Sequence, residues 1–188
     1  VHSGIGHTRW ATHGGPTDAN AHPHVDNDEK LAVIHNGIIE NYTELRAQLE
    51  AKGHKFSSET DTESVAHLLS DLRKEHHGDL TAAMRDAVKV LRGSFTLLAL
   101  HADQPDVVVG VRRNSPLVVG VGDGENFMAS DVAAFIEYTK HAIELGQDEI
   151  VTMTPTTVSI IDLDGKTVKA KEYKISWDAS AAKKGGFA

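Results

Sequence analysis

The chain has 188 residues, of which 40% are hydrophobic and 24% are charged, and it carries a net charge of −8. This balance is typical of a folded globular domain, and the acidic excess argues against an extended nucleic-acid-binding surface. No apolar run approaches the ~18 residues of a transmembrane helix. The sequence contains no cysteine, which excludes thiolate metal ligands within it and fits a reducing compartment, so we expect a cytoplasmic protein.

The first quarter of the sequence predicts two strands separated by a long polar loop. Residues 4–12 (GIGHTRWAT) alternate well enough for a strand, and the loop after them extends to Asp28. Residues 30–35 (KLAVIH) predict a buried strand. Asn36 and Gly37 follow it and form a strong turn signal, so we expect the strand to end there.

Three helices are predicted after this turn from the spacing of apolar residues. Asn41 is expected to cap the first helix, with Glu44 as its capping-box partner. A short strand is expected at 55–58. The second helix is expected to be capped by Thr60 or Asp61 and to end at residues 76–78. The third helix is expected at about residues 80–91.

The second half of the chain is predicted to be mostly β structure. A short helix is expected at about 132–138, and the turn at 162–165 predicts that the last two strands form a hairpin. The expected strands cover residues 95–101, 107–112, 117–121, 127–129, 149–153, 157–162 and 168–175. Strands, central helices and further strands together indicate an α+β layered fold with antiparallel sheets.

Two charged residues of the first third are candidates for binding a free amino acid. Arg9 lies beside a Gly-rich loop and could present its planar guanidinium to a carboxylate, although a surface ion pair is the commoner role for a single arginine. Asp61 could hold an ammonium group, although a carboxylate at a helix start is more often an N-cap. A fixed Arg9 and a fixed Asp61 could together clamp both ends of an amino acid.

Histidines in the same region raise the question of a metal site. The sequence has 12 histidines, and the relevant ones are His13, His22, His24 and His35. None of them has the spacing of an established ligand motif, and such histidines more often hydrogen-bond to backbone in a polar loop. We therefore predict no metal and no cofactor, and keep a histidine-rich metal-dependent hydrolase as an alternative.

Asn36, Gly37 and Trp10 each allow more than one interpretation. Asn36 and Gly37 could form a plain tight turn, or an oxyanion hole in which the Asn amide and the Gly N–H donate to one developing negative charge. Trp10 could be a core residue, an interface residue or part of a lid. Spacing alone does not choose between these alternatives.

Four segments of the sequence resemble one family in order and spacing. They are HTRWATHG (7–14), NAHPH (20–24), HNGIIEN (35–41) and SETDTE (58–63), and they are similar to the motifs of class II glutamine amidotransferase domains. The segments 115–131 (SPLVVGVGDGENFMASD) and 148–154 (DEIVTMT) resemble those members that continue into a sugar isomerase domain. The resemblance covers essentially the whole chain.

The resemblance implies a four-layer αββα sandwich of the N-terminal nucleophile hydrolase type. The implied reaction is hydrolysis of L-glutamine to glutamate, with the ammonia channelled to the sugar isomerase domain for conversion of fructose 6-phosphate to glucosamine 6-phosphate. The implied partners are that isomerase domain of the same polypeptide and, for the parent enzyme, a second copy in a homodimer. No nucleic acid or membrane is implied.

The resemblance also assigns roles to individual residues. Arg9 would bind the α-carboxylate of glutamine and Asp61 its α-ammonium group, with Thr12 and His13 as further substrate contacts. Asn36 and Gly37 would form the oxyanion hole. Trp10 would be the gate of a lid that includes Gly14 and Gly15, and His22 would support these residues from behind.

One departure from the family pattern changes the expected activity. The nucleophile of class II glutamine amidotransferases is a cysteine at the mature N-terminus, whose own α-amino group acts as the base. This sequence has no cysteine, so we expect the chain to lack the first strand and the nucleophile of the family and to be inactive toward glutamine. Residues 1–176 are expected to form the amidotransferase domain, incomplete at its N-terminus, and residues 177–188 a linker toward the isomerase domain.

Two alternatives to a glutamine amidotransferase follow from the same residues. A non-catalytic module could keep the Arg9 and Asp61 clamp and bind glutamine or glutamate without turnover. A metal-dependent hydrolase would use His13, His22 and His24 and would be inhibited by chelators.

Overall fold

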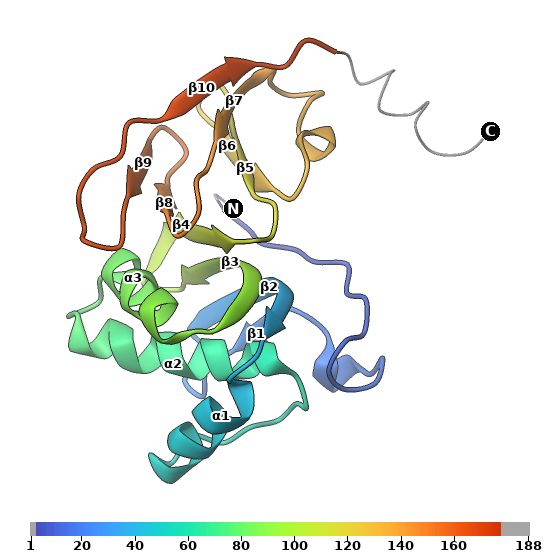
Figure 1. Cartoon of the computed structure of the whole chain (residues 1–188), viewed down its shortest axis with the longest axis vertical. Helices are drawn as coiled ribbons and strands as arrows, with labels where there is room; N and C mark the ends of the chain where they lie inside the picture. The colour runs from blue at the N-terminus through green and yellow to red at the C-terminus, as the bar shows by residue number, and fades with distance from the viewer. Residues whose placement is uncertain (1–2, 178–188) are drawn as a thin grey trace.

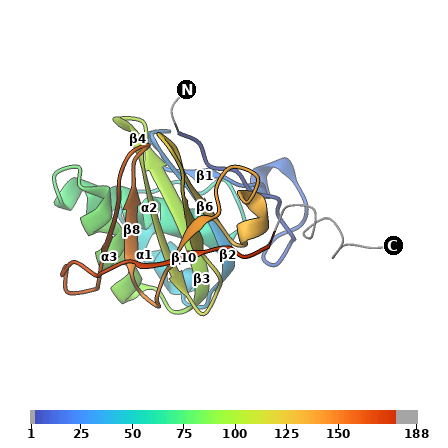
Figure 2. The same ribbon diagram turned by 90° about the horizontal axis from the view of Figure 1, so that it is seen from above.

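A computed structural model describes residues 3–177. Two antiparallel sheets pack face to face, and three helices cover the outer face of the larger sheet (Figure 1). The larger sheet has six strands in the order β1-β2-β3-β4-β8-β9, and the smaller has four in the order β10-β7-β5-β6. In the view from above, strands of the two sheets overlie one another at the centre of the molecule (Figure 2).

The elements have the following limits. The strands are β1 (His24–Val25), β2 (Leu31–Ile39), β3 (Gly93–His101), β4 (Gln104–Arg113), β5 (Val118–Val121), β6 (Asn126–Ala129), β7 (His141–Glu144), β8 (Ile150–Met153), β9 (Val158–Ile161) and β10 (Lys171–Lys174). The helices are α1 (Tyr42–Ala51), α2 (Asp61–Glu75) and α3 (Leu80–Val90), with short 3-10 helices η1 (Asp18–Asn20) and η2 (Val132–Ala134). None of the helices within residues 3–177 is long and apolar enough to cross a membrane.

Three apolar layers hold these elements together. Side chains along β3 alternate between two of these layers. Phe95, Leu97 and Ala99 face the helices, whereas Leu98 faces the smaller sheet. The helices contribute the buried stripe of α3, including Met84 and Val88, as its 3.6-residue spacing predicts. Burial of these side chains is the main stabilising contribution to the sandwich.

The third apolar layer lies on the outer face of the smaller sheet. Phe135, directly after η2, is 1% exposed and packs there with Ile136 and Ala142. A Cβ atom at Gly120 of β5 would lie 2.6 Å from the Phe135 ring, so the glycine makes room for it. Helices, two sheets and the η2 segment form four layers, and the predicted α+β sandwich is confirmed.

Two predictions for the first quarter were wrong. Residues 4–12 alternate in exposure but form no strand, because no strand within residues 3–177 forms a ladder with them. Asn36 and Gly37 do not end a strand. They lie inside β2, which continues to Ile39 and pairs residue by residue with β3. A turn signal in the sequence is thus overridden by pairing with a distant strand.

The expected capping box and the strand at 55–58 are also absent. Asn41 stands at the N-cap position of α1 as predicted, but its side chain makes no capping bond, because its Nδ2 donates to Val90 O at 3.1 Å and its Oδ1 accepts from Arg92 N–H at 2.9 Å. Residues 55–58 are not a strand, since the N–H groups of Ser57 and Ser58 donate to the Glu63 carboxylate instead.

The C-terminal third departs from prediction in its strand pairing. The turn at 162–165 is present, with Gly165 N–H donating to Asp162 O at 3.0 Å. The predicted hairpin is confirmed only next to this turn, where Ile161 and Thr167 form an antiparallel bridge and Val168 N–H donates to Ile160 O at 2.9 Å. Farther along the chain, β10 pairs with β7 and not with β9, which pairs with β8. Strand β7 was not predicted, and the helix expected at 132–138 is a 3-10 helix of one turn, η2.

Candidate functional site

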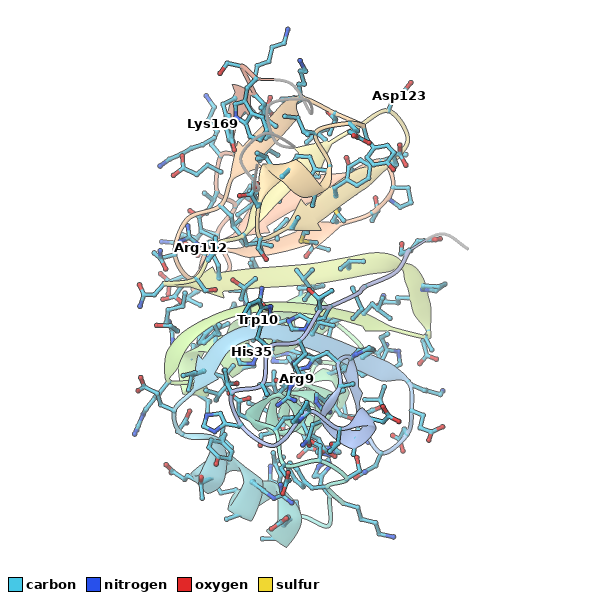
Figure 3. The ribbon with its side chains drawn as sticks, turned by 90° about the vertical axis from the view of Figure 1, so that its right-hand side faces the viewer. Arg9, Trp10, His35, Arg112, Asp123 and Lys169 are labelled. Atoms are coloured by element: carbon cyan, nitrogen blue, oxygen red, sulfur yellow. The ribbon has the colours of Figure 1, made fainter. Side chains whose placement is uncertain are left out.

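A pocket of about 270 Å³ lies beside β2, between the N-terminal segment and the start of α2. Figure 3 shows Arg9, Trp10 and His35 near one another beside β2, whereas Asp123 and Lys169 lie at the far end of the smaller sheet. The pocket is lined by His7, Thr8, Arg9, Trp10, Thr12, His22, His35, Asn36, Gly37, Thr60, Asp61 and Thr62. Four parts of the chain that are separate in sequence, 7–12, His22, 35–37 and 60–62, therefore meet in one cavity.

Arg9 lies in the N-terminal wall of the pocket and braces the loop after it. Its Nη1 donates to Gly15 O at 3.0 Å and its Nη2 to Gly14 O at 3.2 Å. Gly14 has a φ of +78°, and a Cβ atom there would lie 2.6 Å from the Asn20 amide nitrogen. That amide also donates to Gly15 O at 3.0 Å, so the 13–15 loop is held from both sides.

The remaining residues of the predicted lid occupy different places around the pocket. Trp10 lines the rim with its side chain 90% exposed, which rules out the core interpretation. Thr12 also lines the pocket, but His13 does not. The His13 ring instead packs on Tyr42 of α1, with ring centroids 4.9 Å apart.

Asp61 lies in the opposite wall, at the first position of α2. Thr60 is the N-cap, since its side chain accepts from Glu63 N–H, and Asp61 is therefore free of capping. Asp61 is 3% exposed, and its Oδ2 accepts from Ile39 N–H at 2.8 Å. Its Oδ1 has only long contacts, 3.5 Å from Thr62 Oγ1 and 3.8 Å from His35 Nδ1.

Asn36 and Gly37 form the floor between these walls. Gly37 has a φ of +112°, and a Cβ atom there would lie 2.1 Å from Ser94 O, so only glycine fits this close approach of β2 to β3. The Asn36 Oδ1 lies 2.6 Å from His7 Nε2, and its Nδ2 donates to Ser130 Oγ at 3.0 Å. The carboxamide thereby links the N-terminal segment to the residue after β6.

The histidines beside the pocket form hydrogen bonds with threonine hydroxyl groups. Thr62 Oγ1 lies 3.0 Å from His22 Nε2 and 2.9 Å from His35 Nδ1. Burial lowers the pKa of His22 to about 3, with further lowering by the neighbouring His7. Burial also lowers the pKa of His35 to about 4, although the Asp61 carboxylate opposes this shift. Both rings are therefore neutral at pH 7.

The geometry gives the histidine cluster no metal-binding arrangement. No group of three or more His, Cys, Asp or Glu side chains within residues 3–177 lies where it could hold a metal ion. His24 bonds to Thr60 Oγ1 at 2.9 Å, and its pKa is lowered mainly by burial. The imidazoles act as hydrogen-bonding neighbours of the α2 threonines.

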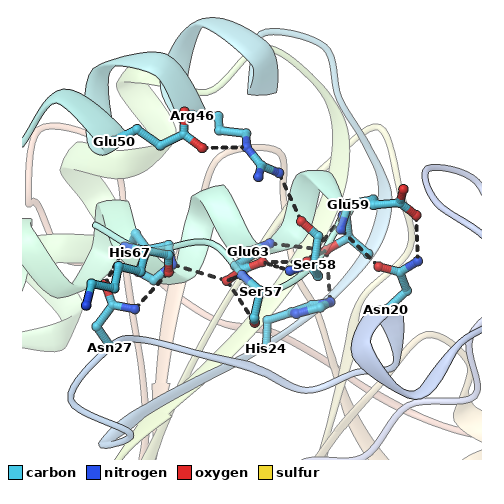
Figure 4. Close-up of polar contacts among 12 residues, drawn as sticks. Asn20, His24, Asn27, Arg46, Glu50, Ser57, Ser58, Glu59, Glu63 and His67 are labelled. Atoms are coloured by element: carbon cyan, nitrogen blue, oxygen red, sulfur yellow. Dashed lines mark hydrogen bonds and ion pairs between the residues drawn. The ribbon is translucent and has the colours of Figure 1, made fainter. Parts of the chain in front are cut away.

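A buried carboxylate holds the start of α2 in place (Figure 4). Glu63 is 2% exposed and accepts from Ser57 N–H at 2.8 Å, Ser58 N–H at 2.7 Å and Ser58 Oγ at 2.6 Å. Burial alone would raise its pKa. The hydrogen bonds, led by that of His67 and followed by that of Ser58, together outweigh burial and lower the pKa to about 2. Ionised Glu63 thus fixes the loop that precedes Asp61.

A second cavity of about 390 Å³ adjoins the first and shares His7, His35 and Asn36 with it. Its other lining residues come largely from the space between the sheets and include Leu98, Leu117 and Met128. The site therefore combines a polar pocket, with a guanidinium, a carboxylate and an amide, and an adjoining apolar cavity. That set suits a free amino acid whose side chain carries a carbonyl oxygen.

The structure brings together most of the residues that the sequence singled out. Arg9, Trp10, Thr12, His22, Asn36, Gly37 and Asp61 line the pocket. His13, Gly14 and Gly15 lie behind it in the loop that Arg9 braces. His7, Thr62 and Ser130 have no role that the sequence predicts. All three lie inside the quoted segments, but nothing in their spacing indicates partners that are 27 to 94 residues away.

The sequence is similar to proteins of one known family. The profile of the glutamine amidotransferase domain family matches residues 7–137. The chain is 60% identical over 186 residues to glutamine–fructose-6-phosphate aminotransferase (isomerizing) from Streptomyces coelicolor. It is 58% identical over 185 residues to the protein of that name from Corynebacterium glutamicum and 52% over 184 residues to that from Thermus thermophilus. The alignments cover 98–99% of this chain but 30% of each relative.

Solved structures show the same fold. Glutamine phosphoribosylpyrophosphate amidotransferase from B. subtilis matches 95% of this chain and 41% of its own, with a TM-score of 0.67 and 20% identity. A structure described as the allosteric regulatory enzyme of purine biosynthesis matches 92% of this chain and 35% of its own, with a TM-score of 0.61 and 25% identity.

Proposed function

This chain belongs to the glutamine amidotransferase family, and we propose that it is the glutamine-binding part of a glutamine–fructose-6-phosphate aminotransferase. The observation that carries the proposal is the pocket that joins Arg9, Asn36, Gly37 and Asp61 from three separate segments. A guanidinium and a carboxylate match the two charged groups of a free amino acid, and the amide matches a side-chain carbonyl.

The proposed pose places the substrate between the two walls. Arg9 binds the α-carboxylate of L-glutamine, and the weakly partnered Oδ1 of Asp61 accepts from its α-ammonium group. The side-chain carbonyl lies toward Asn36 and Gly37, whose N–H groups stabilise the oxyanion that forms during hydrolysis. Thr12 contacts the substrate from the rim. Trp10, at the same rim, gates the exit of ammonia. The loop of His13, Gly14 and Gly15, which lies behind the pocket and is bonded to Arg9, moves when glutamine binds and closes over it.

The nucleophile is the part of the reaction that these residues do not supply. Class II glutamine amidotransferases use an N-terminal cysteine, and the 188 residues contain none. A hydroxyl within the chain cannot replace it, because the mechanism needs the free amine on the nucleophilic residue itself. We therefore propose that this chain binds glutamine but does not hydrolyse it.

The later steps of the reaction belong to the rest of the polypeptide. The chain spans about 30% of the length of its relatives. We assign residues 1–176 to the amidotransferase domain and 177–188 to a linker toward a sugar isomerase domain, which receives ammonia and converts fructose 6-phosphate to glucosamine 6-phosphate. All of that linker except Trp177 lies outside the described residues.

An assay of glutamate release from L-glutamine tests whether hydrolysis requires the N-terminal cysteine that this chain lacks. The assay compares this chain with a longer one that extends upstream to an N-terminal cysteine, and with the longer chain in which that cysteine is replaced by alanine. We expect turnover only when the cysteine is present. Activity of this chain alone would overturn the cysteine mechanism, and chelator sensitivity would then favour a histidine-based hydrolase. Inactivity of all three chains would contradict the glutaminase proposal.

A further inference from the structure

We propose that His7 is a positioning residue that fixes the orientation of the Asn36 carboxamide, so that the amide N–H group faces the reaction site. The inference rests on the proposed function, in which Asn36 donates to the oxyanion. In the proposed pose, His7 contacts neither the substrate nor the nucleophile, and it acts only through Asn36.

His7, Asn36 and Ser130 are joined by two successive side-chain hydrogen bonds. His7 Nε2 lies 2.6 Å from Asn36 Oδ1, and Asn36 Nδ2 lies 3.0 Å from Ser130 Oγ. The three residues come from the N-terminal segment, from β2 and from the turn after β6, respectively. Asn36 is exposed, so these two hydrogen bonds are what orients its carboxamide among the described residues 3–177.

The direction of the hydrogen bond follows from the other nitrogen of the imidazole. His7 Nδ1 is buried and has no partner. If Nε2 carries the hydrogen, the unpartnered Nδ1 carries only a lone pair, and Asn36 Oδ1 accepts the hydrogen bond from Nε2–H. If Nδ1 carried the hydrogen, a buried N–H group would be left unpaired, which folded proteins avoid more strictly than an unpaired acceptor. The Nε2–H tautomer is therefore favoured, and it fixes Oδ1 toward His7.

The fixed Oδ1 directs the Nδ2 donor to the opposite side. The Ser130 hydroxyl oxygen now accepts from it at 3.0 Å. A substrate oxygen that gains negative charge is a stronger acceptor than a neutral hydroxyl, so it can take the place of Ser130 during the reaction. With the opposite orientation, the carboxamide oxygen would face that charge and repel it.

Stacking keeps the His7 ring in the position that this role requires. The His7 and His22 rings lie 4.4 Å apart between centroids, with an interplanar angle of 20°. His22 is itself held by Thr62 at 3.0 Å, and its low pKa keeps it neutral, so it does not repel the adjacent ring. His22 thus supports the site through His7, which gives a physical basis for the supporting position predicted for it.

The first test compares two ligands that share the α-amino acid groups. L-glutamine presents a carbonyl oxygen to Asn36, whereas L-norvaline ends in a methyl group and does not. We expect His7→Phe to weaken L-glutamine binding about 10-fold in calorimetry while leaving L-norvaline affinity unchanged, because one hydrogen bond to the ligand is lost. His7→Gln, which keeps a donor near Nε2, is expected to restore most of the glutamine affinity.

His141→Phe is the matched control. His141 also bonds through Nε2, to Glu172 at 2.9 Å, but it lies on β7 of the other sheet. This change is expected to leave both affinities unaltered. Equal losses of glutamine and norvaline affinity in His7→Phe would show a general structural role and overturn the proposal, as would unchanged glutamine affinity.

A second measurement tests the positioning without any ligand. The side-chain amide signals of ¹⁵N-labelled Asn36 are expected to keep one set of shifts in His7→Gln and to shift or broaden in His7→Phe. Unchanged Asn36 signals in His7→Phe would overturn the proposal. If the unmodified chain binds no L-glutamine, the proposed function fails, and this measurement still decides the role of His7.

Discussion

The two walls of the pocket are built in different ways. The start of α2 is buried and densely hydrogen-bonded: Asp61 is held by Ile39 N–H, and the preceding loop by the Glu63 carboxylate. The N-terminal wall has no strand ladder, Trp10 is 90% exposed, and Arg9 bonds only to the carbonyls of its own loop. The fixed wall sets the position of the ammonium ligand, and the exposed wall provides the part that can close over a substrate.

This contrast predicts that removing a hydrogen-bond acceptor from the fixed wall costs stability, whereas changing a group that faces the cavity, in either wall, changes ligand binding. Asn20 joins the two walls. It is 2% exposed, accepts from Glu59 N–H at 2.9 Å and donates to Gly15 O at 3.0 Å. This buried amide, together with the bond between His22 and Thr62, aligns the two sides of the pocket.

The largest expected effect is that of Glu63→Ala on folding. The change leaves the buried Ser58 N–H group and the partly buried Ser57 N–H group without an acceptor, and we expect the free energy of unfolding to fall by about 3 kcal/mol. Urea denaturation measures it. Glu50→Ala is the control, because Glu50 forms an exposed ion pair with Arg46 whose loss should cost less than about 1 kcal/mol. Equal losses in both variants would contradict a fixed wall built around Glu63.

Asp61→Asn should separate binding from folding. The asparagine oxygen can still accept from Ile39 N–H, so folding should change little. The loss of a negative charge opposite the α-ammonium group should weaken L-glutamine binding about 30-fold, which calorimetry measures. Asp28→Asn, on the surface beside Lys74, is the control. Unaltered glutamine affinity in Asp61→Asn would remove this residue from the clamp.

The pH dependence of stability tests the neutral histidines of the fixed wall. His35 has an ordinary pKa of 6.5 and a folded-state pKa of about 4, so the unfolded chain binds the proton more readily. Stability should therefore be constant above pH 6.5 and fall between pH 6.5 and 4, by up to about 1.4 kcal/mol per pH unit for this group. His35→Asn keeps a polar group near Nδ1 but does not titrate. Its unfolding free energy should fall less steeply, and identical slopes would refute the account.

The smallest expected effect on folding is that of Trp10→Ala. The side chain is 90% exposed, so the free energy of unfolding should change by less than about 0.5 kcal/mol. Glutamine affinity should nevertheless fall, because Trp10 lines the rim of the pocket. Parallel thermal unfolding and ligand titration check this. A large loss of stability would show that the exposed wall is structural after all.

Residue identities in the pocket could be predicted from the sequence better than their local structure. Arg9, Asn36, Gly37 and Asp61 belong to long motifs, and the structure places all four in one cavity. The role of Gly37 as a turn was mispredicted, because its positive φ serves the close approach of Ser94 O across β2 and β3. A local signal gives the conformation of a glycine but not the distant strand that requires it.

Strand pairing and side-chain partners needed three-dimensional information. The turn at 162–165 forms as its residues predict, but sheet packing sends β10 to β7. His7 carries no sequence signal for its role, since its partner Asn36 is 29 residues away. The sandwich itself was predictable from the family motifs, whereas alternation and helical spacing alone indicated only an α+β fold with antiparallel sheets.

Titration of the ¹⁵N-labelled chain with L-glutamine, and with D-glutamine as the control, tests the central claim most directly. The account predicts saturable shifts for L-glutamine in both walls, at Arg9 and at Asp61, and at the Asn36 side chain between them. D-glutamine, which cannot satisfy both charged ends and the floor together, should cause much smaller shifts. Equal responses to the two enantiomers, or L-glutamine shifts confined to residues away from this pocket, would contradict it.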